Sequence, residues 1–257
     1  MKDTLHKASA EAGKIIKEYF ETKFHIESKD VISNLVTEVD KKSESKIIEI
    51  IRSDFPNHNI LSEEIGALDT DSNVKWIIDP IDGTINYAHS IPLCCVSIGV
   101  EKNGEIILGV VYNPMSGEYF FAEKGKGATL NNKKISISKE DKLGKSLLVT
   151  GFPYDTSRNP YKPVSVFAEF VNSDIPVRRL GSAALDLCWT ACGRFDGFWE
   201  YNLNPWDVAA GYLIMTEAGG KVTDFDGKDF SVYSKQILAS NGLIHIQMLN
   251  VINKAKK

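Results

Sequence analysis

A chain of 257 residues and 28.5 kDa is long enough to bury a substantial core, which suits one large domain or two closely packed subdomains. Its net charge is 30 − 34 = −4, and this weakly acidic balance argues against a nucleic-acid partner or an anionic membrane surface. No apolar run approaches the roughly 18 residues that span a bilayer, so no membrane partner is expected.

The first third of the chain predicts two helices, over residues 3–21 and 40–53. The first is amphipathic and charged from its start, so we expect a helix of the mature protein rather than a signal peptide. In the second, four isoleucines at helical spacing supply the buried side. A short strand around Ile60 and Leu61 follows and leads into Ser62-Glu63-Glu64.

The middle of the chain is rich in predicted strands. The runs CCVSIGVEK and EIILGVVYN flank Asn103-Gly104, a dipeptide typical of a two-residue hairpin turn. The runs EYFFAEK, ATL and KKISIS, the last two around Asn131-Asn132, continue this antiparallel pattern.

From about Ser146 onward, predicted strands and helices alternate. LLVTG precedes a helix near 161–172, VRRLG precedes the helix SAALDLCWTACG, and DGFWEY precedes WDVAAGYLIMTEAGG, a helix closed by a Gly-Gly cap. KVTDF, QILAS and a helix from Leu243 complete the chain. The pattern predicts mixed α and β structure with helices covering sheets, divided into subdomains 1–145 and 146–257 that form one compact unit.

The four cysteines are spaced like core residues rather than like a disulfide framework. Cys94 and Cys95 adjoin in a strand-like run, and Cys188 and Cys192 are four residues apart in a helix-like run. The second pair has a spacing that suits a metal shared with a histidine, but no histidine is near it in sequence. We therefore expect a reduced, cytoplasmic protein.

The segment WIIDPIDGTINY, residues 76–87, ends a hydrophobic strand with two carboxylates, Asp79 and Asp82. Converging carboxylates repel each other unless a cation or a proton neutralises them. Mg²⁺ suits this role because it takes oxygen ligands and keeps waters and phosphate among them. A solvated turn is the better interpretation of a lone D-x-x-D, but not of D-P-x-D-G-T after a buried strand. Gly83 lets the backbone approach an anion, and a helix starting at Thr84 would present N–H groups to phosphate.

Two further acidic residues accompany this pair. Glu63 follows a short apolar strand, and Asp207 stands in Pro205-Trp206-Asp207 at the predicted first turn of a helix. Taken alone, neighbouring glutamates are typical of a solvated surface, and an aspartate at a helix start is typical of a cap.

The combination resembles a known family. WIIDPIDGTINY is similar to the first signature of the inositol monophosphatase family, and WDVAAGYLIMTEAGGKVTD is similar to the second. LVTEVD, SEE and GKGATLNNKKI also fit, so the resemblance covers nearly the whole chain. It implies an α+β fold, the layered αβαβα sandwich of the inositol monophosphatase and fructose bisphosphatase type. It also implies a lithium-sensitive phosphatase, a homodimer, with two or three Mg²⁺ ions per site.

The resemblance also implies roles for individual residues. Thr84 orients the attacking water with help from Asp40 and Lys29, and Glu63 belongs to the catalytic set. The metal ligands are Glu63, Asp79, the backbone carbonyl of Ile81, Asp82 and Asp207. The substrate contacts are the phosphate-binding Gly83 and Thr84, the lining residues Gly181, Ser182 and Ala183, the hydroxyl-binding Glu200, and Asp207.

The substrate is expected to be a small phosphate ester. Ile85-Asn86-Tyr87 resembles the inositol monophosphatase branch, which implies hydrolysis of inositol monophosphates by direct attack of a metal-activated water. Alternatives with the same chemistry are fructose 1,6-bisphosphate, NADP and 3′-phosphoadenosine 5′-phosphate. A glutamate such as Glu200 has the plainer alternative of supporting the metal ligands.

A different class of function is an interaction protein associated with RNA polymerase or ribosomal RNA. Its candidate contact surface consists of three arginines, Arg178, Arg179 and Arg194. Their plainer interpretation is solvated residues or a subunit interface. An intact acidic site favours the enzyme, because a binding module does not need one.

Overall fold

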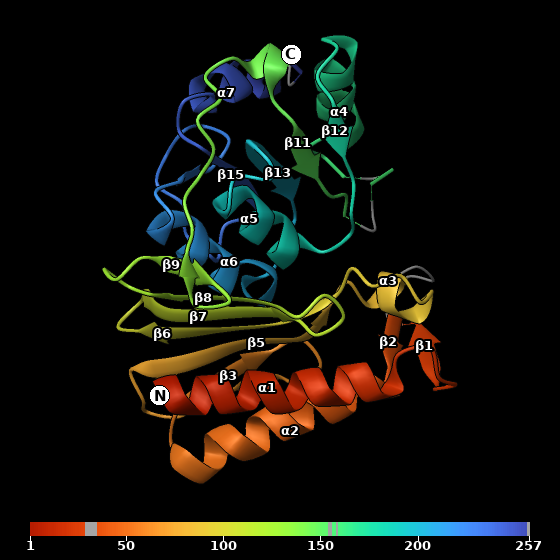
Figure 1. Ribbon diagram of the computed structural model, residues 1–257, viewed down its shortest axis with the longest axis vertical. Helices are drawn as coiled ribbons and strands as arrows, with labels where there is room; N and C mark the ends of the chain where they lie inside the picture. The colour runs from red at the N-terminus through yellow and green to blue at the C-terminus, as the bar shows by residue number, and fades with distance from the viewer. Residues whose placement is uncertain (29–34, 154–155, 158, 256–257) are drawn as a thin grey trace.

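The computed structural model describes residues 1–28, 35–153, 156–157 and 159–255. These residues form alternating layers of helix, sheet, helix, sheet and helix, which follow one another from bottom to top in Figure 1. The αβαβα sandwich expected from the sequence is thereby confirmed. Lys29 lies outside the described residues, so its proposed role is not tested.

The outermost layer at the N-terminal end consists of α1 (Lys2–Tyr19) and α2 (Glu38–Asp54), which lie side by side under the larger sheet. In α1, apolar side chains at helical spacing are fully buried: Leu5, Ala8, Ala12 and Ile16. The second helix begins two residues earlier than predicted because Thr37 caps it. The Thr37 hydroxyl accepts the Asp40 N–H, and the Asp40 carboxylate accepts the Thr37 N–H.

The larger sheet has the strand order β10-β9-β8-β7-β6-β5-β3-β4. The predicted hairpin turn is confirmed, because Asn103 and Gly104 both have positive φ, 54° and 80°. β3 and β5 run parallel, and the other neighbours are antiparallel. The strands are β3 (Asn59–Ser62), β4 (Gly66–Leu68), β5 (Val74–Asp82), β6 (Cys95–Lys102), β7 (Glu105–Asn113), β8 (Glu118–Glu123), β9 (Ala128–Leu130) and β10 (Lys133–Lys134).

The run KKISIS is not a full strand, contrary to the prediction. β10 contains its two lysines alone, and the chain then leaves the sheet. The Ile137 N–H donates to the Ala218 carbonyl beyond helix α6 (Pro205–Glu217), and the Ser138 hydroxyl donates to Asp196. These contacts with distant segments replace the strand pairing that a local alternating pattern suggested.

Helices α5 (Ala183–Ala191) and α6 form the middle layer between the two sheets. Two sheet glycines allow α6 to approach closely: a Cβ at Gly99 would lie 2.9 Å from the Ala209 Cβ, and one at Gly109 would lie 2.9 Å from the Ala210 carbonyl oxygen. The Gly-Gly cap is confirmed, since Gly219 has φ 93° and the Gly220 N–H donates to the Met215 carbonyl. This packing sets the position of the N-terminal end of α6.

The smaller sheet has the order β12-β11-β13-β15-β14 and is covered on its outer face by α4 and α7. The division of the chain at residues 145 and 146 stays a proposal; it falls between η1 and β11. The remaining elements are β1 (Ile26–Ser28), β2 (Leu35–Thr37), α3 (Thr84–Ala88), η1 (Leu143–Lys145), β11 (Leu148–Thr150), α4 (Pro163–Asn172), β12 (Val177–Arg178), β13 (Gly197–Tyr201), β14 (Lys221–Thr223), β15 (Gln236–Ser240) and α7 (His245–Ala255).

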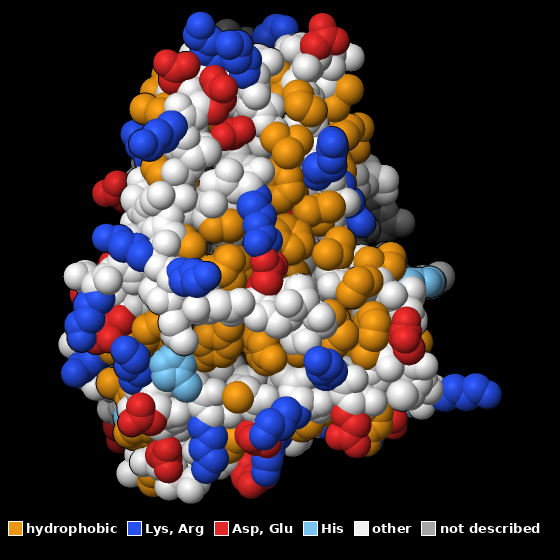
Figure 2. All heavy atoms as spheres, viewed as in Figure 1, with side chains coloured by type: hydrophobic (Ala, Val, Ile, Leu, Met, Phe, Trp, Pro, Cys, Tyr) orange, Lys and Arg blue, Asp and Glu red, His pale blue; other side chains and the backbone are white. Residues whose placement is uncertain are grey.

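The cysteines are core residues, as predicted. Cys94, Cys95 and Cys188 are buried, Cys192 is half-buried, and none of the four forms a disulfide. On the face shown in Figure 2, Lys and Arg side chains are interspersed with Asp and Glu, in keeping with the small net charge. Across the described residues, every helix is too short or too polar to cross a bilayer.

Candidate functional site

A cavity of about 360 Å³ opens where the ends of β5 and β13 meet the N-terminal ends of α5 and α6. All of the predicted metal ligands and substrate contacts line it: Glu63, Asp79, Ile81, Asp82, Gly83, Thr84, Gly181, Ser182, Ala183, Glu200 and Asp207. Of the other predicted residues, Asp40 is behind the cavity wall. Segments far apart in the sequence, at 63, 79–84, 181–183 and 200–207, thus converge on one space.

A bulge at the end of β5 brings its two aspartates to the same wall. Asp79 pairs with Ser97 and Asp82 with Cys95, so three steps along β5 oppose two steps along β6. In a regular strand, residues three apart point to opposite faces. The extra residue cancels this alternation. Pro80 suits the position, because the ladder is interrupted there and proline has no N–H to donate.

Hydrogen bonds from the protein orient both carboxylates. Asp79 accepts the Ile81 N–H through Oδ1 at 3.0 Å. Asp82 accepts the Ser182 hydroxyl at 2.6 Å and the Ala184 N–H at 2.7 Å, both through Oδ2. Each side chain therefore has one oxygen held by the protein and a second oxygen left for a ligand in the cavity.

Asp207 is held in the same manner at the start of α6. Its Oδ2 accepts the Asn204 N–H at 2.6 Å, in a capping box with Asn204 as N-cap. The plain interpretation of Asp207 as a helix-start residue is therefore correct, and it does not compete with ligand binding. One oxygen completes the cap, while Oδ1 is the oxygen left for the cavity.

The electrostatics of these carboxylates favour a cation. Burial, followed by the charge of Glu63, raises the pKa of Asp79 and of Asp207 well above the ordinary value. Burial also raises the pKa of Asp82 to about 6. Buried carboxylates close to one another favour their neutral, protonated form unless a bound cation compensates their negative charges.

The ligand atoms that the cavity offers are of the type that Mg²⁺ prefers. Carboxylates and the Ile81 carbonyl offer oxygen atoms alone, which a hard divalent ion prefers. Within the described residues, no three acidic, histidine or cysteine side chains form a ready-made cage. Mg²⁺ is commonly bound through one or two carboxylates, with waters and substrate phosphate completing the shell, so the arrangement remains compatible with it.

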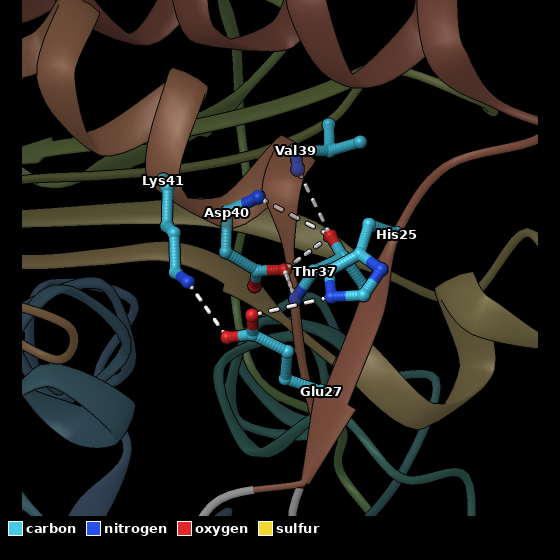
Figure 3. A network of polar contacts seen from close by, with 6 residues as sticks. All are labelled: His25, Glu27, Thr37, Val39, Asp40 and Lys41. Carbon is cyan, nitrogen blue, oxygen red and sulfur yellow. Dashed lines mark hydrogen bonds and ion pairs between the residues drawn. The ribbon is translucent and has the colours of Figure 1, made fainter.

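Thr84 joins the cavity to a buried network on α2. Its hydroxyl is 2.9 Å from the Ile81 carbonyl oxygen and 3.2 Å from Asp40 Oδ1, and it can donate to either. Asp40 Oδ2 accepts the Thr37 hydroxyl at 2.5 Å and the Thr37 N–H at 2.8 Å, as Figure 3 shows. Burial raises the pKa of Asp40 to about 7. The structure thus brings Asp40 and Thr84 together, as the sequence predicted.

Gly83 is required by close packing of the chain. It has φ 92° as the N-cap of α3, and a Cβ there would lie 2.7 Å from the Leu93 carbonyl oxygen. The same Cβ would lie 3.3 Å from the Gly181 carbonyl oxygen. The sequence suggested a different reason, the approach of an anion. The helix beginning at Thr84 is present, with five residues.

The substrate-side segment is tied to α3 by Asn86. Its side-chain amide donates to the Leu93 and Leu180 carbonyls, both at 2.8 Å. Glu200 on β13 is 7% exposed, and its carboxylate lies next to Gly151. A Cβ added to Gly151 would lie 2.2 Å from Glu200 Oε1. Gly151 therefore makes the space that the Glu200 carboxylate occupies.

Sequence reasoning did not assign several of the lining residues to the site, among them Asn86, Gly151, Arg179 and Asp186. Asp186 is one turn into α5 and is buried. Its signal in the sequence was a carboxylate inside the otherwise apolar run SAALDLCWTA. Asn86 was noted only as part of Ile85-Asn86-Tyr87, and Gly151 carried no signal, because the contacts of both residues are with distant segments.

Comparisons with known proteins agree with the fold. The model of the inositol monophosphatase family matches residues 1–256. An inositol-1-monophosphatase of Synechocystis sp. is 46% identical over 224 residues, which cover 87% of this chain and 78% of that protein. The Nus factor SuhB of Escherichia coli is 41% identical over 245 residues, covering 95% and 92%. The structure of an inositol monophosphatase from Anabaena (Nostoc) sp. has a TM-score of 0.89 and 43% identity, covering 98% and 94%. The chain belongs to the inositol monophosphatase family.

Proposed function

We propose that this chain is a Mg²⁺-dependent phosphomonoesterase that hydrolyses inositol monophosphates by direct attack of water. One observation carries the proposal. The bulge in β5 places Asp79 and Asp82 on the same wall of a cavity that Glu63 and Asp207 also line. This oxygen-rich wall borders a space of about 360 Å³, which suits a sugar-sized phosphate ester.

We propose that two or three Mg²⁺ ions bind through the carboxylates of Glu63, Asp79, Asp82 and Asp207 and the carbonyl of Ile81. When bound, Mg²⁺ makes a water more acidic and stabilises negative charge on the phosphate and on the leaving oxygen.

The residues of the chain position the reactants. The Thr84 hydroxyl directs its hydrogen toward Ile81 or Asp40, which leaves its lone pairs to accept a hydrogen bond from the attacking water. Thr37 holds Asp40 in place for this role. Gly83 is the N-cap of α3 and Thr84 is its first residue, so their N–H groups have no carbonyl partners inside the helix, and these are the proposed phosphate donors.

The alcohol side of the substrate is assigned to the segment from Gly181 to Ala183 and to Glu200. The carboxylate of Glu200 accepts a hydrogen bond from a ring hydroxyl, and Gly151 gives it the room to do so. Fructose 1,6-bisphosphate, NADP and 3′-phosphoadenosine 5′-phosphate remain the alternative substrates for the same chemistry.

The test is phosphate release from these four substrates with and without Mg²⁺, compared as kcat/KM. The proposal expects the highest value for inositol 1-phosphate and no turnover after chelation. A higher value for one of the other three would reassign the substrate and leave the chemistry in place. Calorimetric titration with Mg²⁺ checks metal binding independently of turnover.

We also propose three properties of the protein in solution and in the cell. We expect inhibition by lithium, a homodimer in light scattering, and a cytoplasmic location, which suits four cysteines without disulfides. Unchanged activity in lithium chloride or a monomeric mass would remove the corresponding proposal.

The second candidate function is an interaction protein, and it has support from the relatives named Nus factor SuhB. The three candidate arginines are in different settings. Arg194 pairs with Glu118, Arg179 lines the cavity, and Arg178 is exposed on β12. All three are exposed, and Arg178 and Arg179 are neighbours in the chain. No phosphate release from the whole panel would favour this second function.

A further inference from the structure

Asp186 has a buried carboxylate that the proposed function does not use. The residue is 1% exposed, and neither carboxylate oxygen has a hydrogen-bond partner within the described residues. The nearby Thr190 hydroxyl donates to the backbone carbonyl of Asp186 and not to its side chain. Buried polar groups are nearly always paired, so an unpaired carboxylate at this depth calls for a partner from outside the chain.

The position of Asp186 identifies where that partner would be. Asp186 lines the candidate cavity one helical turn after Ser182, and Glu200 lines the same cavity from β13. The charge of Glu200 acts on Asp186, while the charges of Asp207 and Asp82 act on Glu200. Asp186 and Glu200 line the same cavity, and neither is a proposed Mg²⁺ ligand; we call them the polyol pair.

The chemistry of the polyol pair restricts its ligand. Burial raises the pKa of both side chains. A carboxyl group accepts hydrogen bonds in either protonation state, so a ligand that donates hydrogen bonds is suitable. A phosphate group is repelled by the two acids, whereas hydroxyl groups of a neutral alcohol are suitable donors. Two carboxyl groups that line one cavity suit two hydroxyls of the same alcohol. Arg179, exposed at the cavity, supplies the nearby positive charge that acts on both acids.

We propose that Asp186 is a specificity-determining residue that accepts a hydrogen bond from a hydroxyl of the leaving alcohol, next to the hydroxyl held by Glu200. The inference rests on the proposed phosphatase function and narrows its substrates to esters of alcohols with at least two free hydroxyls.

The experiment compares two substrates of equal ring size, inositol 1-phosphate and cyclohexyl phosphate, which has no hydroxyls. For Asp186→Asn, which keeps the size of the side chain, kcat/KM on inositol 1-phosphate should fall about 10- to 100-fold, mainly through KM. Its value on cyclohexyl phosphate should stay within about twofold of wild type. Thr190→Val on the same helix is the matched control and should leave the ratio of the two values unchanged.

Thermal unfolding supplies a readout that is independent of turnover. Asp186→Leu removes a buried carboxylate that has no partner, so the Tm of this variant should equal or exceed that of wild type. Its kcat/KM on inositol 1-phosphate should nevertheless fall relative to its kcat/KM on cyclohexyl phosphate. A purely structural role predicts the opposite, a lower Tm with equal losses on both substrates.

Equal losses on both substrates, or no loss on either, would overturn the assignment of Asp186. If neither variant folds, the wild-type protein supplies the test. A similar wild-type kcat/KM on inositol 1-phosphate and cyclohexyl phosphate would also overturn the assignment of Asp186. Failure of the proposed function is distinguishable, because wild type would then release phosphate from neither substrate in Mg²⁺.

Discussion

The Glu44 carboxylate on α2 accepts a hydrogen bond of 2.5 Å from the Ser62 hydroxyl at the end of β3. The same oxygen accepts the Glu64 N–H at 3.1 Å and the Ile65 N–H at 3.2 Å. Glu63 lies inside this turn, and its own N–H donates to the Ile78 carbonyl. One buried oxygen of Glu44 thus holds the turn that carries a proposed Mg²⁺ ligand.

Replacing Glu44 should weaken Mg²⁺ binding more than it weakens catalysis. Glu44→Ala leaves three donors without their acceptor, so the turn should lose its fixed position. We expect the Mg²⁺ concentration for half-maximal activity to rise about tenfold, with kcat largely restored at saturating Mg²⁺. The rise in Tm on adding Mg²⁺ should shift to higher concentration in parallel.

The matched control is Glu49→Ala, an exposed position on the same helix that pairs with Lys46. It should leave the Mg²⁺ dependence unchanged. A Glu44→Ala protein with the wild-type Mg²⁺ dependence and a lower Tm would show that Glu44 is structural alone.

Asp82→Asn should abolish Mg²⁺-dependent phosphate release without unfolding the chain. The amide oxygen of asparagine still accepts the Ser182 hydroxyl and the Ala184 N–H, but it contributes no charge to the cation site. We expect at least a ~100-fold loss of kcat/KM. The Tm should be unchanged or higher, because a buried repelling charge is removed. Full turnover by this variant would contradict the assignment of Asp82 as a metal ligand.

Gly83→Ala should destabilise the fold by about 2–4 kcal/mol, combining the positive-φ penalty with overpacking. The cause is the Cβ that would lie 2.7 Å from the Leu93 carbonyl oxygen. Gly104→Ala is the matched control, since Gly104 also has positive φ, 80°, but has open space around it. It should cost about 1 kcal/mol. Urea unfolding measures both, and equal losses would refute the packing argument.

The fold should lose stability in acid through His245. This buried side chain lies between the Thr223 and Ser240 hydroxyls, at 2.9 and 2.8 Å, and burial lowers its pKa to about 4. The unfolded chain, with a histidine pKa of about 6.5, binds the proton first as the pH falls. The free energy of unfolding should therefore decrease between about pH 6.5 and 4, by roughly 3 kcal/mol in total.

The comparison that isolates this effect is wild type against His245→Gln. The buried aspartates have raised pKa values and change stability in the opposite direction, but they are shared by both proteins. The difference in unfolding free energy between the two proteins should shrink as the pH falls from 6.5 to 4. A difference that is constant with pH would contradict the role of His245.

Local sequence signals succeeded where the cause of a structure is local. Asn103-Gly104 predicted a hairpin because both positions need positive φ, and the structure has it. The short strand β1 was not predicted, because its three residues are all exposed and carry no burial pattern. The run KKISIS was misread because its outcome depends on contacts with α6 and Asp196.

By itself, the sequence determined the acidic inventory of the site, its order along the chain and the family to which the chain belongs. Only the tertiary structure decided how that inventory is used. A bulge opposite β6 turned Asp79 and Asp82 to one side, and the glycines at 99 and 109 let α6 carry Asp207 close to the sheet. The position of Asp186 likewise depends on how α5 packs beside β13. Each of these relationships joins segments distant in the chain, and short-range periodicity contains no information about such contacts.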